Sequence, residues 1–271
     1  MQNAGSISVG IGGLGTIGLA VARALLAGRI PGMHLEAVAV RDPANVAQRL
    51  PGAAVDAVDF ATLAARCGVI LEVLPSAHFR AIAEPAISAG KTFVTLSVGA
   101  LLEAGDLIER ARTCGARIIV PTGALLGLDA VRAAAEGEIY SVTMETRKPP
   151  AGLLGAPYLL EHGIVLDGLR EPQLVFSGSA RDGARGFPAN VNVAAALSLA
   201  GIGPDRTRLD IWADPTVTRN THRIIVEADS VRLTMMIENV PSEENPKTGK
   251  LTALSTITTL RGLVSSLRIG S

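Results

Sequence analysis

Residues near the start of the chain have the spacing of a phosphate-binding loop. The glycine-rich run from Gly10 to Gly18 contains two overlapping matches to the pattern G-x-G-x-x-G, one beginning at Gly10 and the other at Gly13. That pattern has to follow a complete β-strand and open a helix. Only the second match leaves a full strand before it, residues 7–12, so we assign the loop to Gly13, Gly15 and Gly18.

Each glycine of this loop has a separate physical task. Gly13 permits the tight turn, Gly15 lets the backbone approach a pyrophosphate, and Gly18 lets the helix lie close to the sheet. Thr16 and Ile17 begin the helix and would add free backbone N–H groups and a partial positive charge. The loop therefore predicts a bound dinucleotide, and the alternative is a glycine-rich turn without a cofactor.

The second strand-like segment, residues 35–40, ends in Arg41 followed by Asp42. In a dinucleotide-binding unit this is where the adenosine ribose is contacted. An acidic residue there favours NAD, whereas an arginine accommodates the 2′-phosphate of NADP. The two residues therefore indicate opposite preferences. We expect both to contact the cofactor, with NAD favoured and use of both nucleotides left open.

His222 is the candidate for proton transfer. It follows Asn220 near the start of a strand-like segment in the second half of the chain. A neutral imidazole whose pKa lies near the working pH suits a general acid or base. The alternative is a structural histidine with satisfied hydrogen bonds. Neither a metal-binding cluster nor a Ser-His-Asp signature is visible in the sequence.

The elements that must position these residues change in pattern after Gly123. Before it, apolar strands alternate with helices, which predicts a parallel sheet covered on both faces; the strands are residues 6–11, 35–40, 69–74, 93–97 and 117–120. After it, strand-like segments at 138–147, 174–178, 208–213, 221–228 and 231–237 accompany helices at 189–200 and 251–267. The last three strands resemble consecutive antiparallel neighbours. We predict an α/β nucleotide domain at 1–123 and an α+β domain at 124–245.

Composition excludes several classes of protein. The 271 residues contain 25 Lys plus Arg and 25 Asp plus Glu, so no global field attracts nucleic acid or an anionic membrane. The apolar stretches are too short to span a bilayer, and no signal peptide is evident. Cys67 and Cys114 have neither a pairing motif nor metal spacing, which favours reduced structural thiols. We expect a soluble, cytoplasmic protein.

Motifs spread over nearly the whole chain resemble those of the L-aspartate dehydrogenases. They are Gly-Leu-Gly-Thr-Ile-Gly at 13–18, Ser-Val-Gly-Ala-Leu at 97–101, Thr-Gly-Ala-Leu at 122–125, Phe-Pro-Ala-Asn-Val-Asn-Val-Ala-Ala at 187–195, Ala-Asp-Pro at 213–215, Asn-Thr-His at 220–222 and Asn-Pro-Lys-Thr at 245–248. None of these motifs is specific alone, but their combination is. Thr122 departs from the serine usual in the family and keeps its hydrogen-bonding capacity.

The resemblance implies a Rossmann domain plus an α+β domain with an open mixed sheet. It also implies that the C-terminal helix, residues 246–271, packs back on the nucleotide domain. The implied reaction is oxidation of L-aspartate to iminosuccinate with NAD⁺ or NADP⁺, or the reverse reductive amination, in a role that supplies iminoaspartate for NAD synthesis. The family's catalytic histidine falls on His222, and its nicotinamide-side contacts fall on Ala124 and Asn190.

A dicarboxylate substrate would need charge-assisted hydrogen-bond donors. Cationic candidates in the second half are Arg147, Lys148, Arg181, Arg185, Arg219 and Lys247, and for each the alternative is a solvated surface charge. Lys247 falls in the first turn of the final helix, where a cation is mildly disfavoured, and this hints at function. Asn190 and Asn192, two apart, cannot share a helix face but can cap the helix and reach into a cleft. We select Asn192, Asn220 and Lys247 as candidate substrate contacts.

Two other functions remain open. One is a related dehydrogenase of another small acid; a semialdehyde enzyme would need an activated cysteine, and Cys67 and Cys114 precede strands instead of following them. The other is a non-catalytic NAD(H)-binding module. The final apolar helix or the second domain's sheet would supply the face of an expected homodimer.

Overall fold

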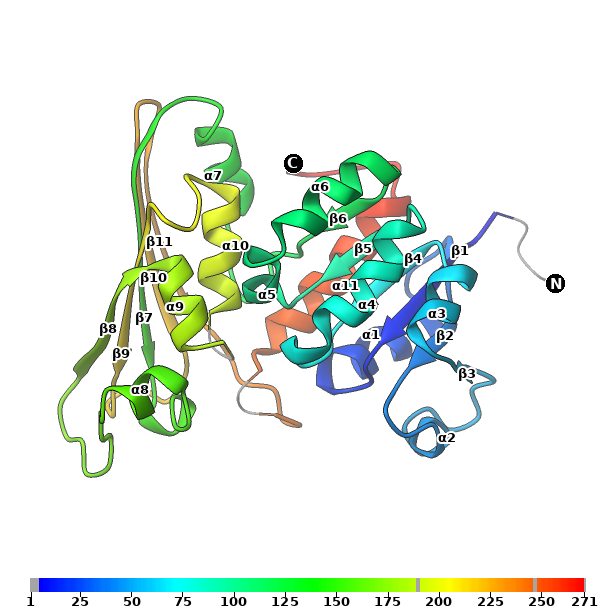
Figure 1. The fold of residues 1–271 in the computed structure, drawn as a ribbon, viewed down its shortest axis with the longest axis horizontal. Coiled ribbons are helices and arrows are strands. Elements are labelled where there is room, and N and C mark those ends of the chain that lie inside the picture. The colour runs from blue at the N-terminus through cyan, green and yellow to red at the C-terminus, as the bar shows by residue number, and fades with distance from the viewer. Residues whose placement is uncertain (1–4, 189–190, 246–247, 271) are drawn as a thin grey trace. The chain divides into compact units, whose positions relative to one another are not determined.

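The computed structural model describes residues 5–188, 191–245 and 248–270. The chain divides into two compact units, coloured along the sequence in Figure 1. The first comprises Met1–Ser97, Glu103–Pro121 and Thr252–Ile269, and the second comprises Val98–Leu102, Thr122–Leu251 and Gly270–Ser271. The predicted boundaries after residues 123 and 245 stay a prediction. In the ranges described, none of the helices combines the length and apolar character that crossing a membrane requires.

A six-stranded parallel sheet forms the centre of the first unit. The parallel sheet and five of its strands were predicted, whereas the two-residue strand β3 was not. Its strand order is β3-β2-β1-β4-β5-β6. The strands are β1 (Ile7–Gly12), β2 (Met33–Ala39), β3 (Asp56–Ala57), β4 (Val69–Glu72), β5 (Thr92–Thr95) and β6 (Arg117–Ile119). The order reverses between β1 and β4, and open α/β sheets bind ligands beyond the carboxyl ends of the strands at such a point.

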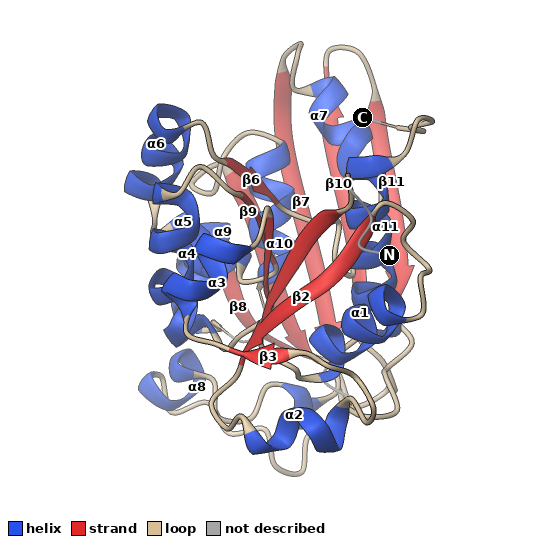
Figure 2. Cartoon of the chain, turned by 90° about the vertical axis from the view of Figure 1, so that its right-hand side faces the viewer, coloured by secondary structure: helices blue, strands red, loops and turns tan. Residues whose placement is uncertain are grey.

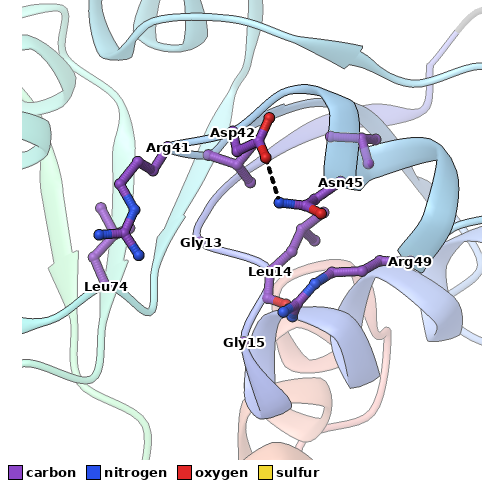
Figure 3. A pocket seen from close by; sticks show the side chains of 10 residues that line it. Gly13, Leu14, Gly15, Arg41, Asp42, Asn45, Arg49 and Leu74 are labelled. Atoms are coloured by element: carbon purple, nitrogen blue, oxygen red, sulfur yellow. Dashed lines mark hydrogen bonds between the residues drawn. The ribbon is translucent and has the colours of Figure 1, made fainter.

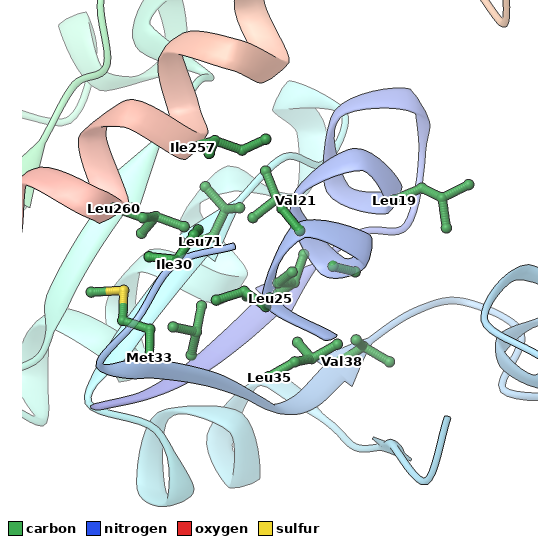
Figure 4. Packing of buried hydrophobic residues seen from close by; sticks show 14 of the residues in the cluster. Leu19, Val21, Leu25, Ile30, Met33, Leu35, Val38, Leu71, Ile257 and Leu260 are labelled. Carbon is green, nitrogen blue, oxygen red and sulfur yellow. The ribbon is translucent and has the colours of Figure 1, made fainter. Parts of the chain in front are cut away.

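Helices cover both faces of this sheet (Figure 2). They are α1 (Thr16–Leu26), α2 (Ala44–Arg49), α3 (Phe60–Arg66), α4 (Phe79–Ser88), α6 (Gly105–Cys114) and α11 (Lys250–Val264). On one face, Val9 and Ile11 of β1 pack with α1 and with Ile257 and Leu260 of α11 in a single apolar cluster (Figure 4). The C-terminal helix therefore completes a core that begins with the first strand.

The second unit contains an open mixed sheet, also as predicted, in the order β11-β10-β7-β9-β8. The strands are β7 (Ile139–Lys148), β8 (Gln173–Ser179), β9 (Thr207–Ala213), β10 (Thr221–Ala228) and β11 (Arg232–Glu238). The helices of this unit are α5 (Val98–Leu102), α7 (Leu128–Ala134), α8 (Pro157–Glu161), α9 (Ala180–Gly186) and α10 (Asn192–Ala200). On β7, residues 142, 144, 146 and 148 are all buried, which defines the face of the sheet toward the core.

The expectation of three consecutive antiparallel strands is wrong for the first of them. β10 and β11 do pair antiparallel, but β9 pairs with β7 in parallel and with β8, so β7 lies between β9 and β10. The longest strand of the sheet thus offers both its edges to strands that follow it by many residues. Local alternation predicts strands but carries no information about which non-local edge they find. Short helices such as α2, α7, α8 and α9 were not predicted, because a few residues show too little periodicity.

Candidate active site

Two positions of the glycine loop in the first unit, Gly13 and Gly18, have room for backbone but not for a side chain. β1 ends at Gly12 and α1 begins at Thr16, which is the placement that the second register requires. Gly13 has a φ of +97°, a conformation that residues with side chains rarely adopt. A Cβ atom on Gly18 would lie 2.0 Å from the carbonyl oxygen of Gly13, so only glycine fits there. The helix therefore starts in direct contact with the turn.

The N-terminus of α1 faces open space. Gly15 is its N-cap residue and provides no side-chain hydrogen bond, and the first turn contains no acidic residue. A Cβ atom on Gly15 would meet nothing within 4 Å. The N–H groups of the first turn, which includes Thr16 and Ile17, are thus the donors available to a phosphate. These features fit a dinucleotide pyrophosphate.

A pocket of about 230 Å³ adjoins this loop (Figure 3). It is lined by Gly13, Leu14, Gly15, Val40, Arg41, Asp42, Asn45, Val46, Arg49 and Leu74. Arg41 and Asp42, the two residues with opposite nucleotide preferences, therefore lie in the same pocket. Arg49 was not selected from the sequence. It lines the pocket and donates a hydrogen bond from Nη1 to the carbonyl of Leu14.

Glu72 is a fully buried carboxylate at the carboxyl end of β4, next to Gly12 of β1 in the sheet. Its Oε1 accepts from the N–H of Leu74 at 2.9 Å and the hydroxyl of Ser97 at 2.9 Å. Its Oε2 accepts from the hydroxyl of Thr95 at 2.6 Å and from the N–H of Ser97 at 3.2 Å. Burial raises the pKa of Glu72, and the hydrogen bonds oppose that shift. The Glu72 carboxylate therefore links the segments at the carboxyl ends of β4 and β5. In the sequence, the only signal for this role is an acidic residue at the end of an apolar strand.

His222 of β10 is buried and neutral. It pairs with Thr146 of β7 in the sheet, and its Nδ1 lies 3.1 Å from the Thr146 hydroxyl oxygen. Burial lowers the pKa of His222 to about 3, and the positive charge of Lys148 adds to this shift. When Nδ1 carries the hydrogen and donates it to Thr146, Nε2 has the lone pair that accepts a proton.

Lys148 stands out among the cationic candidates. It follows Thr146 by two residues on the buried face of β7, and burial lowers the pKa of its ammonium group to about 8. Arg147 instead forms ion pairs with Glu145 and Asp214, and Arg181 forms one with Asp205. The sequence signal for Lys148 is the alternation of residues along β7. It identifies Lys148 as buried only once the core-facing side of that strand is known.

The structure places the remaining candidates as follows. Ala124 accepts a hydrogen bond through its carbonyl from Nδ2 of Asn239 at 3.3 Å. Asn239 is buried, and among the described residues its Oδ1 has no partner, so it is a polar group that sequence reasoning missed. The N–H of Asn239 donates to the carbonyl of Asn220. Asn192 accepts through Oδ1 from the N–H of Gly99 at 3.0 Å. Asn190 and Lys247 lie outside the described residues.

Cysteine and metal chemistry find little support in the structure. Cys67 is buried, and burial raises the pKa of its thiol to about 11, so it is not an activated nucleophile. Cys114 is exposed at the end of α6, and both thiols are free. Within the described ranges, no three His, Cys, Asp or Glu side chains are grouped in a way that could hold a metal ion.

Comparisons with known proteins agree with this arrangement. Residues 13–121 match the family model for the NAD-binding domain of homoserine dehydrogenase, and residues 129–263 match the model for the C-terminal part of aspartate dehydrogenase. The L-aspartate dehydrogenase of Bradyrhizobium diazoefficiens is 55% identical, and the alignment covers 98% of this chain and 94% of that protein. L-aspartate dehydrogenase 3 of Bordetella bronchiseptica is 50% identical, with all of both chains covered.

A solved structure shows the same fold. The aspartate dehydrogenase of Thermotoga maritima aligns with a TM-score of 0.72 over 97% of this chain and 99% of that chain, at 23% identity. The parallel nucleotide-binding sheet, its glycine loop and the mixed sheet define a two-domain dehydrogenase that uses a nicotinamide dinucleotide. Within that class, the chain belongs to the L-aspartate dehydrogenase family.

Two alanine substitutions separate the loop's structural and binding tasks. Gly15→Ala adds a methyl group to open space, so stability should stay within about 1 kcal/mol of the wild type. The same methyl group should weaken cofactor binding about tenfold or more, because it occupies the position of the pyrophosphate. Gly18→Ala should destabilise the fold by about 1–3 kcal/mol, because the helix must move away from Gly13.

Urea unfolding and titration of NADH and NADPH fluorescence measure the two effects. Gly262→Ala in α11, where a Cβ atom also meets nothing, is the matched control; it should leave cofactor affinity unchanged and stabilise the fold by up to about 1 kcal/mol, because alanine favours a helix more than glycine does. Unaltered cofactor affinity in Gly15→Ala would contradict the assignment of the loop.

Proposed function

We propose that the protein catalyses the NAD(P)-dependent oxidation of L-aspartate to iminosuccinate and the reverse reductive amination. The observation that carries this proposal is the buried pair formed by neutral His222 and cationic Lys148 on neighbouring strands of one unit. The family membership adds the substrate, since the named relatives are L-aspartate dehydrogenases. The proposed roles of single residues below rest on this geometry.

The first unit supplies most of the cofactor's proposed contacts. Gly13, Gly15, Thr16, Ile17 and Gly18 hold the pyrophosphate, and the pocket that contains Arg41 and Asp42 receives the adenosine ribose. In the second unit, we assign the nicotinamide end to Ala124 and Asn190. When bound, the cofactor supplies the hydride acceptor for the Cα–H of L-aspartate. Every other chemical task falls to side chains of this chain.

His222 takes the proton that must leave the substrate's ammonium group before the hydride can depart from Cα. In the tautomer whose Nδ1 donates to Thr146, the free lone pair of Nε2 is the proton acceptor. In the free protein the imidazole is a weak base because it is buried beside a cation. A bound dicarboxylate adds negative charge next to His222, which raises its pKa toward the range that proton transfer needs. In the reverse direction the imidazolium returns the proton to nitrogen.

Lys148 binds a substrate carboxylate. An ammonium group of reduced solvation gains more from a charged hydrogen bond than one in water, because the local dielectric is low. Asn192, Asn220 and Lys247 stay proposed substrate contacts.

We also propose that the enzyme is a cytoplasmic homodimer that supplies iminoaspartate for NAD synthesis. The exposed apolar side chains Tyr140 and Met236, both on strands of the mixed sheet, support the dimer.

The direct test is spectrophotometric. Purified protein should reduce NAD⁺ or NADP⁺ when L-aspartate is added. In the reverse direction, iminosuccinate that forms from oxaloacetate and ammonia should oxidise the reduced cofactor. A panel of other small amino and hydroxy acids distinguishes a related dehydrogenase. Tight cofactor binding with no turnover of any panel member would indicate a non-catalytic module instead.

His222→Ala should lower kcat about 10²-fold or more in that assay, because it removes the proton acceptor. Cofactor affinity should change little, since His222 is not among the residues assigned to the cofactor. His34→Ala, at a half-exposed histidine of the first unit, is the matched control and should retain full activity. A kcat of His222→Ala equal to that of the wild type would remove the assigned role.

Binding of the unreactive dicarboxylate succinate should depend on pH through Lys148. The pKa of Lys148 is depressed to about 8, so its charged form is complete below pH 7 and is lost as the pH rises through 8. The succinate Kd should therefore approach a tenfold increase per pH unit above 8. The pKa of His222 is about 3 in the free protein and rises when a dicarboxylate binds, so His222 affects binding at the acidic end and not above pH 8.

Calorimetry with saturating cofactor measures these constants. Lys148→Met should bind succinate weakly at every pH, whereas Lys91→Met in the first unit should follow the wild type. A wild-type Kd that stays flat to pH 9.5 would exclude Lys148 as the carboxylate ligand.

A further inference from the structure

The pocket beside the glycine loop has an excess of positive charge. Its charged lining residues are Arg41, Asp42 and Arg49, two cations against one anion. Among the described residues, neither guanidinium forms an ion pair with a carboxylate, whereas Arg66, Arg80 and several other arginines of the chain do. The charge of the pocket is therefore not neutralised by the protein around it.

Asp42 is committed to its own turn. Its Oδ1 accepts from the N–H of Ala44 at 3.1 Å, and its Oδ2 accepts from Nδ2 of Asn45 at 2.7 Å. Both donors belong to the first turn of α2, where a carboxylate also complements the helix dipole. In Figure 3 the carboxylate is turned toward Asn45 and away from Arg41. Each oxygen of the acidic residue that could accept from a ribose 2′-hydroxyl thus already accepts one hydrogen bond from α2.

The two arginines reach the pocket from different elements. Arg41 follows β2, and its side chain lies on the Leu74 side of the pocket in Figure 3. Arg49 ends α2, and its hydrogen bond to the carbonyl of Leu14 fixes the guanidinium against the glycine loop. That bond uses one of five guanidinium N–H groups, so the remaining donors stay available for an anion.

We propose that Arg41 and Arg49 bind the 2′-phosphate of NADP, and that the enzyme discriminates in favour of NADP over NAD. This inference rests on the proposed function for the identity of the cofactor. A phosphate monoester carries nearly two negative charges and oxygens that match the guanidinium fork. The 2′-hydroxyl of NAD offers neither, and the carboxylate that would accept from it points toward α2. The sequence favoured NAD because it could not show where Asp42 points.

Arg49 also connects the two phosphate sites. Its guanidinium contacts Leu14, the residue between Gly13 and Gly15, so an anion held by Arg49 steadies the loop that receives the pyrophosphate. An anion bound by Arg49 should therefore also restrain the turn at Leu14.

Calorimetric titration with two nucleotide fragments tests the proposal without any turnover. Adenosine 2′,5′-bisphosphate should bind the wild type about tenfold or more tightly than adenosine 5′-monophosphate at 0.1 M salt. Arg41→Gln and Arg49→Gln should each weaken the bisphosphate more than the monophosphate and so remove most of that preference. Arg112→Gln, at an exposed arginine paired with Glu109 on α6, is the matched control and should keep the preference.

Steady-state kinetics supply the second readout. In both pocket variants KM should rise more for NADP⁺ than for NAD⁺, so that the preference for NADP⁺ falls. Equal affinity of the wild type for the two fragments would overturn the proposal, as would variants that weaken both fragments alike. A bisphosphate preference in a protein that does not oxidise L-aspartate would refute the proposed function and leave this inference standing.

Discussion

The close approach of α1 to the turn after β1 is the constraint on which the nucleotide-binding half depends. At that crossing the Gly13 carbonyl occupies the space that a side chain on residue 18 would need. With no side chain there, α1 lies against the sheet, packs Val21 and Leu25 into its core and begins at the reversal of the strand order. The contact between Gly18 and Gly13 positions three features of the site. They are the turn itself, the free N–H groups of α1 and the Leu14 carbonyl that holds Arg49.

Desolvation governs the second unit in the same way. Two basic side chains, His222 and Lys148, lie on the buried face of a sheet whose other residues on that face are largely apolar. Burial favours the neutral form of each group, and their mutual repulsion lowers the pKa of the imidazole further. Such an arrangement costs stability in the free protein, and a bound anion reverses that cost. The site therefore gains most from the ligand charge that the proposed substrate carries.

The sequence predicted features that depend on local pattern. The register of the glycine loop followed from strand length, and the parallel sheet followed from the alternation of apolar strands with helices. Glu72, Asn239 and the special status of Lys148 could not be predicted, because each depends on which segments meet. Glu72 becomes notable only when Thr95 and Ser97 donate to it, and Asn239 only when it reaches Ala124. The position of β7 between β9 and β10 is likewise a non-local choice.

A chain with no net charge can still be built to bind anions, because charge acts over short distances in water. At physiological ionic strength a field is screened within about 8 Å, so global neutrality says little about a single pocket. This chain gathers cations at two places, Arg41 and Arg49 beside the glycine loop and Lys148 beside His222. Elsewhere many charges cancel in pairs, as in Arg80 with Asp106. A nucleotide phosphate would meet two arginines at the first place, and a dicarboxylate would meet a buried ammonium group at the second.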